Sequence, residues 1–242
     1  MSYIDNLIQR LSDDSLVPGE SLSSGMLYES SKTISWAAHE EARKLNNTEY
    51  IDELQQLIKS EKDKDRKKNI IFILGHLAKN AGRHEIANIL IDQLNGEKDK
   101  FTIIAILNRL EEIYKDKSVD LTTIYKLSDH KNWHIRSAAY AALTYTEHET
   151  ENFLIQKAKA TEDKGDLLYL LRSITKIGTI KAIETTESLM KHRSRDVKES
   201  AANTTAIIML RENFSFEEIR KRTKLKDVAI EAFKNKLDKY TV

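Results

Sequence analysis

The chain has 242 residues, 40% apolar and 32% charged, which is enough for one large core or one extended stack of small units. Its 39 basic and 38 acidic side chains nearly cancel, so the whole-chain field is too weak to steer nucleic acid or an anionic membrane. The sequence has no cysteine, which excludes disulfides, thiolate metal sites and cysteine nucleophiles.

The chain begins with a predicted capping helix, from Tyr3 to Leu11, followed by a loop that contains Val17-Pro18-Gly19. This start lacks the basic residues and the unbroken apolar stretch of a signal peptide. No apolar run of about 18 residues, the length that a membrane span needs, occurs in the sequence. We therefore expect a cytoplasmic protein that does not enter a membrane.

Helical periodicity runs through the rest of the chain. Apolar residues recur at spacings of three and four, as in Ile70, Ile71, Leu74, Leu77 and Ala78. A single proline and seven glycines leave few helix breakers, and no alternating strand pattern is present. The sequence therefore predicts an all-α protein.

Glycine spacing predicts that these helices come in pairs. Gly82 and Gly178 are 96 residues apart and Gly96 and Gly165 are 69 apart, near three and two multiples of about 33. Each glycine is expected to end a helix in the left-handed conformation. First helices are predicted to begin near Thr33, Lys67, Phe101, His134, Asp166 and Val197, and second helices near Glu49, Arg83, Val119, Glu147, Ile180 and Phe216.

Three of the predicted helix starts carry possible capping boxes, in which a short side chain and a glutamate three residues later cap each other. The pairs are Thr146 with Glu149, Ser215 with Glu218 and, more loosely, Asp196 with Glu199.

The stretch DHKNWHIRSAAYAAL, residues 129–143, resembles a HEAT-like helical repeat. In that family an Asp ends one unit, an apolar-Arg pair opens the next, and small residues let neighbouring helices approach. The matching residues here are Asp129, Ile135, Arg136, Ala138, Ala139, Ala142 and Leu143. A weaker copy supplies Asp196, Val197, Lys198, Ala201, Ala202 and Ile207.

The resemblance implies one domain over residues 1–242, a right-handed α-α superhelix (α-solenoid) of about five to six HEAT-like helix pairs. Residues 1–26 would be an N-terminal cap helix and loop, 27–222 the repeats, and 223–242 a C-terminal cap helix. Residues of the Asp129 and Arg136 type are expected to form a polar ladder between units. The segment from Ser215 to Leu237 also resembles a helix-turn-helix, although a terminal cap would have the same pattern.

Solenoids of this family bind macromolecules, so the leading expectation is a non-enzymatic scaffold that is a monomer, needs no cofactor and binds another protein. If second helices line the concave face, as the resemblance implies, mixed polar side chains form the contact surface. These are Gln56, Lys59, Asp92, Lys126, Gln156 and Lys159. Trp133 either covers a junction between units or anchors the partner.

Positive charge concentrates towards the C-terminal end of the chain. Residues 1–121 carry 17 basic and 21 acidic side chains, whereas residues 122–242 carry 22 and 17. The candidate anion-binding residues are Arg193, Arg195, Lys198, Arg220, Lys221 and Arg222. They are either solvated helix ends or a site for an anionic partner, so nucleic-acid binding is the second expectation.

Two enzyme classes built on HEAT-like repeats fit the sequence less well. A di-iron hydroxylase needs His-Glu pairs at one phase of the repeat, whereas His39-Glu40, His84-Glu85 and His148-Glu149 fall at different phases. A DNA glycosylase needs an aromatic and acidic cluster, whereas Trp36 and Trp133 fall in different units. Phosphate-binding, serine-hydrolase, zinc-protease and dinucleotide motifs do not occur in the sequence.

Overall fold

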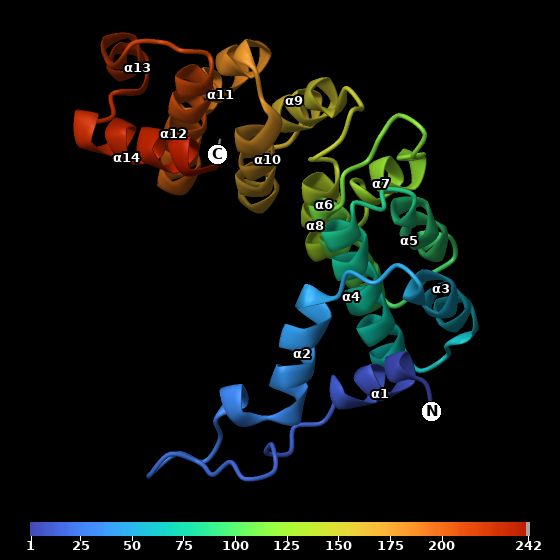
Figure 1. The fold of residues 1–242 in the computed structure, drawn as a ribbon. Coiled ribbons are helices and arrows are strands. Elements are labelled where there is room, and N and C mark those ends of the chain that lie inside the picture. The colour runs from blue at the N-terminus through green and yellow to red at the C-terminus, as the bar shows by residue number, and fades with distance from the viewer. Residues whose placement is uncertain (241–242) are drawn as a thin grey trace. The chain divides into compact units, whose positions relative to one another are not determined.

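Helices and the turns between them make up the chain in a computed structural model that describes residues 1–240, with side chains through Leu237 (Figure 1). Within the described residues there is no strand, and the β-type pairing is one isolated bridge between Leu16 and Thr33. The all-α prediction is confirmed. No helix in this described part combines the length and apolarity needed to cross a membrane.

The chain divides into two compact units, residues 1–124 and residues 125–242, which are described separately. The first contains α1 (Tyr3–Arg10), η1 (Ser30–Lys32), α2 (Ile34–Lys44), α3 (Tyr50–Ser60), α4 (Lys64–Ala81), α5 (Ile86–Leu94) and α6 (Lys100–Glu112). Helix α7 (Thr122–Leu127) lies at the boundary along the chain. In the first unit α4 is central, because it packs against α2, α3, α5 and α6.

The second unit contains α8 (Trp133–Ala142), α9 (Thr150–Ala160), α10 (Lys164–Ile177), η2 (Ile180–Ala182), α11 (Ile183–Leu189), α12 (Arg195–Arg211), α13 (Phe216–Thr223) and α14 (Asp227–Tyr240). Helix α10 packs against α8, α9 and α12, and α12 packs against α11, α13 and α14. Leu167, Leu171, Val197 and Ala201 form a core cluster between α10 and α12.

The twelve predicted helix starts all lie within three residues of observed starts, six on the first helices α2, α4, α6, α8, α10 and α12 and six on the second helices α3, α5, α7, α9, α11 and α13. The predicted terminal elements are also present, since α1 ends at Arg10 and the tight turn at Lys224 separates α13 from α14. Within each unit successive first helices pack on each other, α2 on α4 and α4 on α6, and α8 on α10 and α10 on α12. The right-handed superhelix and the single-domain organisation stay predictions.

Aspartates begin several of the first helices. Asp63, Asp99 and Asp163 are the N-caps of α4, α6 and α10, and each side chain accepts a hydrogen bond from a backbone N–H of the first turn. Asp99 also pairs with Lys64 at 3.0 Å across α4 and α6. The Thr102 amide and Lys64 together lower the pKa of Asp99 to about 2.

Polar contacts between consecutive pairs recur in the second unit. Arg136 on α8 donates from Nε to both carboxylate oxygens of Asp166 on α10, at 3.1 and 2.9 Å. Lys164 on α10 pairs with Asp196 on α12, and Lys157 on α9 pairs with Asp129. The predicted ladder residues therefore make contacts between helix pairs, although Arg136 and Asp129 bond to other residues and not to each other.

Two of the three predicted capping boxes are wrong. Ser215 and Glu218 form the box at the start of α13, as expected. Helix α9 begins only at Thr150, because the Thr146 hydroxyl instead accepts from the His148 amide and forms a local turn. Asp196 lies inside the first turn of α12, where Ser194 is the N-cap.

The prediction that glycines end helices in the left-handed conformation is right for two glycines and wrong for two others. Gly82 and Gly96 have positive φ angles of 63° and 85°, as expected at helix ends. Gly165 lies inside α10, and Gly178 has φ −62°, so the prediction is wrong for both. At Gly178 the need is space, because a Cβ would lie 2.6 Å from the Ile174 carbonyl oxygen and 3.0 Å from Ile208 Cδ1.

Candidate functional site

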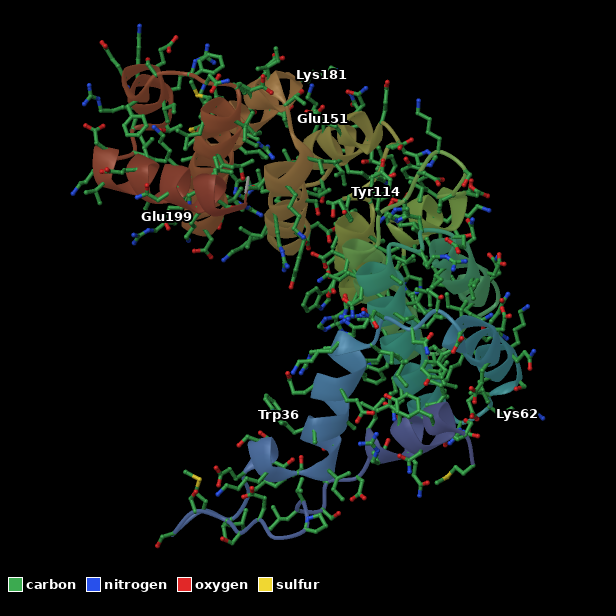
Figure 2. All side chains as sticks on the ribbon, in the orientation of Figure 1. Trp36, Lys62, Tyr114, Glu151, Lys181 and Glu199 are labelled. Carbon is green, nitrogen blue, oxygen red and sulfur yellow. The ribbon has the colours of Figure 1, made fainter. Side chains whose placement is uncertain are left out.

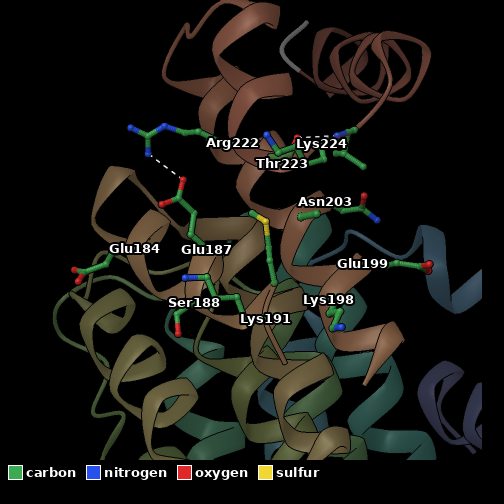
Figure 3. Close-up of a pocket in the computed structure, with 13 residues that line it drawn as sticks. Glu184, Glu187, Ser188, Lys191, Lys198, Glu199, Asn203, Arg222, Thr223 and Lys224 are labelled. Carbon is green, nitrogen blue, oxygen red and sulfur yellow. Dashed lines mark hydrogen bonds and ion pairs between the residues drawn. The ribbon is translucent and has the colours of Figure 1, made fainter. Parts of the chain in front are cut away.

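A groove of about 1040 Å³ lies in the second unit, between α11, α12 and the turn that joins α13 to α14 (Figure 3). We call it the C-terminal groove. Its apolar lining comes from Met190, Ala202 and Leu225, and Met190 packs against the core cluster of α10 and α12. Its polar lining consists of Glu184, Glu187, Ser188, Lys191, Lys198, Glu199, Asn203, Arg222, Thr223 and Lys224.

The wall formed by α13 is positioned by local backbone chemistry. The Ser215–Glu218 box starts α13, and the buried Thr223 hydroxyl donates to the Ile219 carbonyl at 2.8 Å near its end. Lys224 then adopts φ 60°, a left-handed conformation that turns the chain towards α14. This turn brings Lys224 and Leu225 to the groove edge.

The charges in the groove are only partly balanced. Arg222 pairs with Glu187 at 3.0 Å, and Glu199 pairs with Arg195 at 2.6 Å. Lys191, Lys198 and Lys224 are exposed and have no ion-pair partner among the described residues, and Glu184 is the unpaired carboxylate of the lining. Three lysines and one glutamate therefore remain for a ligand, beside an apolar floor.

The groove contains two of the six predicted anion-binding residues, Lys198 and Arg222. Arg195 forms an ion pair with Glu199 on its own helix, and Arg220 forms one with Asp227 at 3.2 Å. Arg193 and Lys221 are exposed outside the groove lining. The two basic stretches, residues 191–198 and 220–226, therefore contribute only some of their basic side chains to the groove.

The predicted partner-contact residues lie on the second helices. Gln56 and Lys59 are on α3, Asp92 is on α5, Lys126 is on α7, and Gln156 and Lys159 are on α9. All six are exposed. Lys159 also lines a smaller groove of about 350 Å³ with Glu162, Glu184 and His192.

Trp133 lies at the start of α8 with 46% of its surface exposed. Its ring stacks on that of His134, with centroids 3.5 Å apart, and lies 6.0 Å from the ring of Tyr169 on α10. It therefore covers part of the junction between α8 and α10 and still presents surface to solvent.

A second groove, of about 620 Å³, lies in the first unit between the segment that follows α1 and helices α2, α4 and α6. Phe72 lines it, with the guanidinium of Arg109 5.5 Å and that of Arg43 5.8 Å from its ring centroid. His39 also lines the groove and meets the Phe72 ring edge-on. It lies on α2, the helix on which Figure 2 labels Trp36. A Cβ at Gly75 would lie 2.8 Å from Arg109 Cβ, so glycine is needed for this approach of α6 to α4.

His76 beside this cluster is expected to make stability depend on pH. Burial and the guanidinium of Arg109, whose Nη1 lies 2.8 Å from His76 Nε2, lower its pKa from 6.5 to about 4. Glu112 opposes this shift, whereas Lys79 and Arg43 add to it.

The unfolded chain gains a proton at this histidine near pH 6.5, whereas the folded chain does so only near pH 4, so the free energy of unfolding falls as the pH drops through that interval. We expect His76→Gln to lose less stability than the parent between pH 7 and pH 5 in urea unfolding. His130→Gln is the control. Equal losses in the parent and His76→Gln would contradict the effect.

The three His-Glu pairs do not meet in a metal-like cluster, since no group of three or more His, Asp or Glu side chains among the described residues has metal-binding geometry. The His39 ring bonds to the Ser35 carbonyl at 2.7 Å, and the His84 ring meets that of Tyr114 edge-on.

No protein-family model matches the chain, and no curated protein is similar enough to be identified as a relative.

The sequence prediction missed most of the C-terminal groove. Lys191 and Lys224 belong to the same basic stretches as the predicted residues, so net charge had indicated their region. The apolar floor gave no signal, because Met190 and Leu225 are 35 positions apart and resemble ordinary core residues in the sequence.

Proposed function

We propose that this chain is a non-enzymatic protein-interaction module, a HEAT-like stack of helix pairs that binds an acidic, partly apolar segment of another protein in the C-terminal groove. The observation that carries the proposal is the combination of an apolar floor with Lys191, Lys198 and Lys224, none of which has an ion-pair partner among the described residues. Burying apolar side chains on the floor would supply affinity, and the lysines would select acidic sequences.

The mixed charge of the groove favours a protein ligand over a phosphate backbone. Glu184, Glu187 and Glu199 line it together with four basic residues. A phosphate chain would meet these carboxylates without compensation, whereas a folded or extended peptide can place its own donors against them.

The HEAT-like part of the proposal is supported by the packing within each unit. Arg136 and Asp166 join consecutive first helices, and Ala138 and Ala139 are buried in α8, which packs against α10. The exposed polar residues of α3, α5, α7 and α9, together with Trp133, remain a second candidate surface for the same kind of partner.

Binding of an acidic amphipathic peptide, followed by fluorescence anisotropy, tests the proposal. We expect the Lys191→Glu/Lys198→Glu double variant to bind at least about tenfold more weakly, because two attractive contacts become repulsive. The matched control is Lys181→Glu, an exposed lysine of η2 outside the groove (Figure 2), which should bind like the parent. Equal affinities for the double variant and the control would overturn the proposal.

Nucleic-acid binding through the basic C-terminal end is the second candidate, favoured by the convergence of Lys198 and Arg222 on one groove. Duplex binding would weaken steeply with salt, with a log-log slope of about −0.9 for each phosphate contact, whereas the peptide should show a shallower dependence. A tight, sequence-selective duplex complex that is lost in the Arg220→Ala/Lys221→Ala/Arg222→Ala variant would replace our proposal with the helix-turn-helix alternative.

A further inference from the structure

The loop between α1 and α2 exposes large apolar side chains that nothing in its own unit covers. Leu27 is 99% exposed, Tyr28 58% and Met26 54%, and Leu22 is also exposed. In Figure 1 this loop extends away from α1 and α2. Single exposed apolar residues are ordinary, but four within seven positions on one loop are typical of a contact surface.

Polar contacts hold this loop in shape. The ammonium of Lys32 donates to the Ser21 carbonyl at 2.8 Å and pairs with Glu29 at 3.0 Å. The Ser23 hydroxyl donates to Glu29 at 2.8 Å, and the Met26 amide donates to the Ser23 carbonyl at 3.0 Å. These bonds tie the base of the loop, so its tip, Met26 to Tyr28, is presented with less conformational entropy to lose on binding.

The loop is acidic as well as apolar. Residues 11–33 contain four carboxylates, Asp13, Asp14, Glu20 and Glu29, and one basic side chain, Lys32, which pairs with Glu29. Glu20 and Asp13 have no ion-pair partner among the described residues. The combination of apolar and acidic side chains matches the C-terminal groove, where Lys191, Lys198 and Lys224 surround an apolar floor.

We infer that the apolar loop of one copy of this chain docks into the C-terminal groove of a second copy. The inference rests on the proposed function, because it supplies an occupant for the same groove. Met26, Leu27 and Tyr28 cover the floor made by Met190, Ala202 and Leu225, and the loop carboxylates lie against the groove lysines. An anionic membrane or a nucleic acid is disfavoured as the occupant of the loop, since both repel its carboxylates.

The two surfaces are different, so the contact is heterologous. Each copy offers one loop and one groove, and repetition of the contact builds head-to-tail chains or a closed ring. The inference departs from the sequence-based expectation of a monomer and predicts weak association that grows with concentration. The sequence did not indicate this association, because the exposure of the loop tip depends on the fold.

Sedimentation velocity over a range of concentrations tests the inference, with two variants that each lose one half of the contact. Leu27→Asp removes the loop anchor, and Lys191→Glu/Lys198→Glu reverses charge in the groove. All three side chains are exposed, so circular dichroism and melting should match the parent. Each variant should associate at least about tenfold more weakly than the parent.

An equimolar mixture of the two variants gives the sharpest result. One variant keeps an intact groove and the other an intact loop, so the mixture should form a 1:1 dimer and nothing larger. A mixture that stays monomeric, or a parent protein that stays monomeric at every concentration, would overturn the inference. Persistent association of either single variant would overturn it as well.

A labelled peptide of residues 20–31 separates this inference from the proposed function. Binding of the peptide to the groove in a chain that never self-associates would leave the proposed function standing and the second-copy inference wrong. If neither this peptide nor an unrelated acidic amphipathic peptide binds, the proposed function fails together with the inference.

Discussion

Ala139→Glu should destabilise the second unit by about 3–5 kcal/mol, because it places an unpaired carboxylate at a fully buried position of α8. Ala139 is 0% exposed, its neighbour Ala138 is 7% exposed, and α8 packs directly on α10. The cation three residues earlier on α8, Arg136, is already engaged by Asp166. A loss of this size lowers the thermal midpoint by roughly 10 °C or more, which circular dichroism at 222 nm measures.

The matched control is Ala232→Glu, which makes the same change at an exposed position of α14 in the same unit. It should alter stability by no more than about 0.5 kcal/mol. If Ala139→Glu melts like this control, the small residues of α8 do not mediate close packing and the HEAT-like interpretation of that stretch is wrong.

The helical framework was predictable because it depends on local chemistry. Apolar spacing indicated the buried face of each helix, and a short oxygen side chain such as that of Ser215 indicated where a helix begins. The wrong predictions of caps and helix ends fall where one residue can adopt either of two local structures. Around Thr146 a hydroxyl can cap a helix or close a turn, and the turn forms. Gly178 can relieve either backbone strain or crowding, and in the fold it relieves crowding.

The candidate site was predictable only in part, for a different reason. The basic residues indicated the end of the chain where the C-terminal groove lies. Which of their charges remain unpaired depends on neighbours in three dimensions, which the sequence does not give. Arg222 and Arg220 look equivalent in the sequence, yet Glu187 neutralises one and Asp227 the other, on different elements. The sequence predicted a loop around Leu27 but not the exposure of its tip. That exposure depends on whether other parts of the fold pack against the loop.

Lys115 has a structural role that its sequence context does not indicate. It is 0% exposed, and its ammonium donates to the Leu110 carbonyl at 2.6 Å and to the Ile113 carbonyl at 2.7 Å. These carbonyls lie at the C-terminal end of α6, where the last turn lacks helical partners and the helix dipole is negative. One buried cation therefore satisfies two backbone acceptors of buried residues at the end of the helix.

Lys115→Met keeps most of the aliphatic stem and removes the donor, so it should lower the free energy of unfolding of the first unit by about 2–4 kcal/mol. Urea unfolding followed by circular dichroism measures the change. Lys117→Met is the matched control, since Lys117 lies two residues along the same segment but is exposed, and it should stay within about 0.5 kcal/mol of the parent. Both residues occur in the run KDK and are indistinguishable by sequence. If Lys115→Met unfolds at the parent's urea concentration, the two hydrogen bonds do no more than offset the desolvation of the ammonium, and α6 does not depend on this cap.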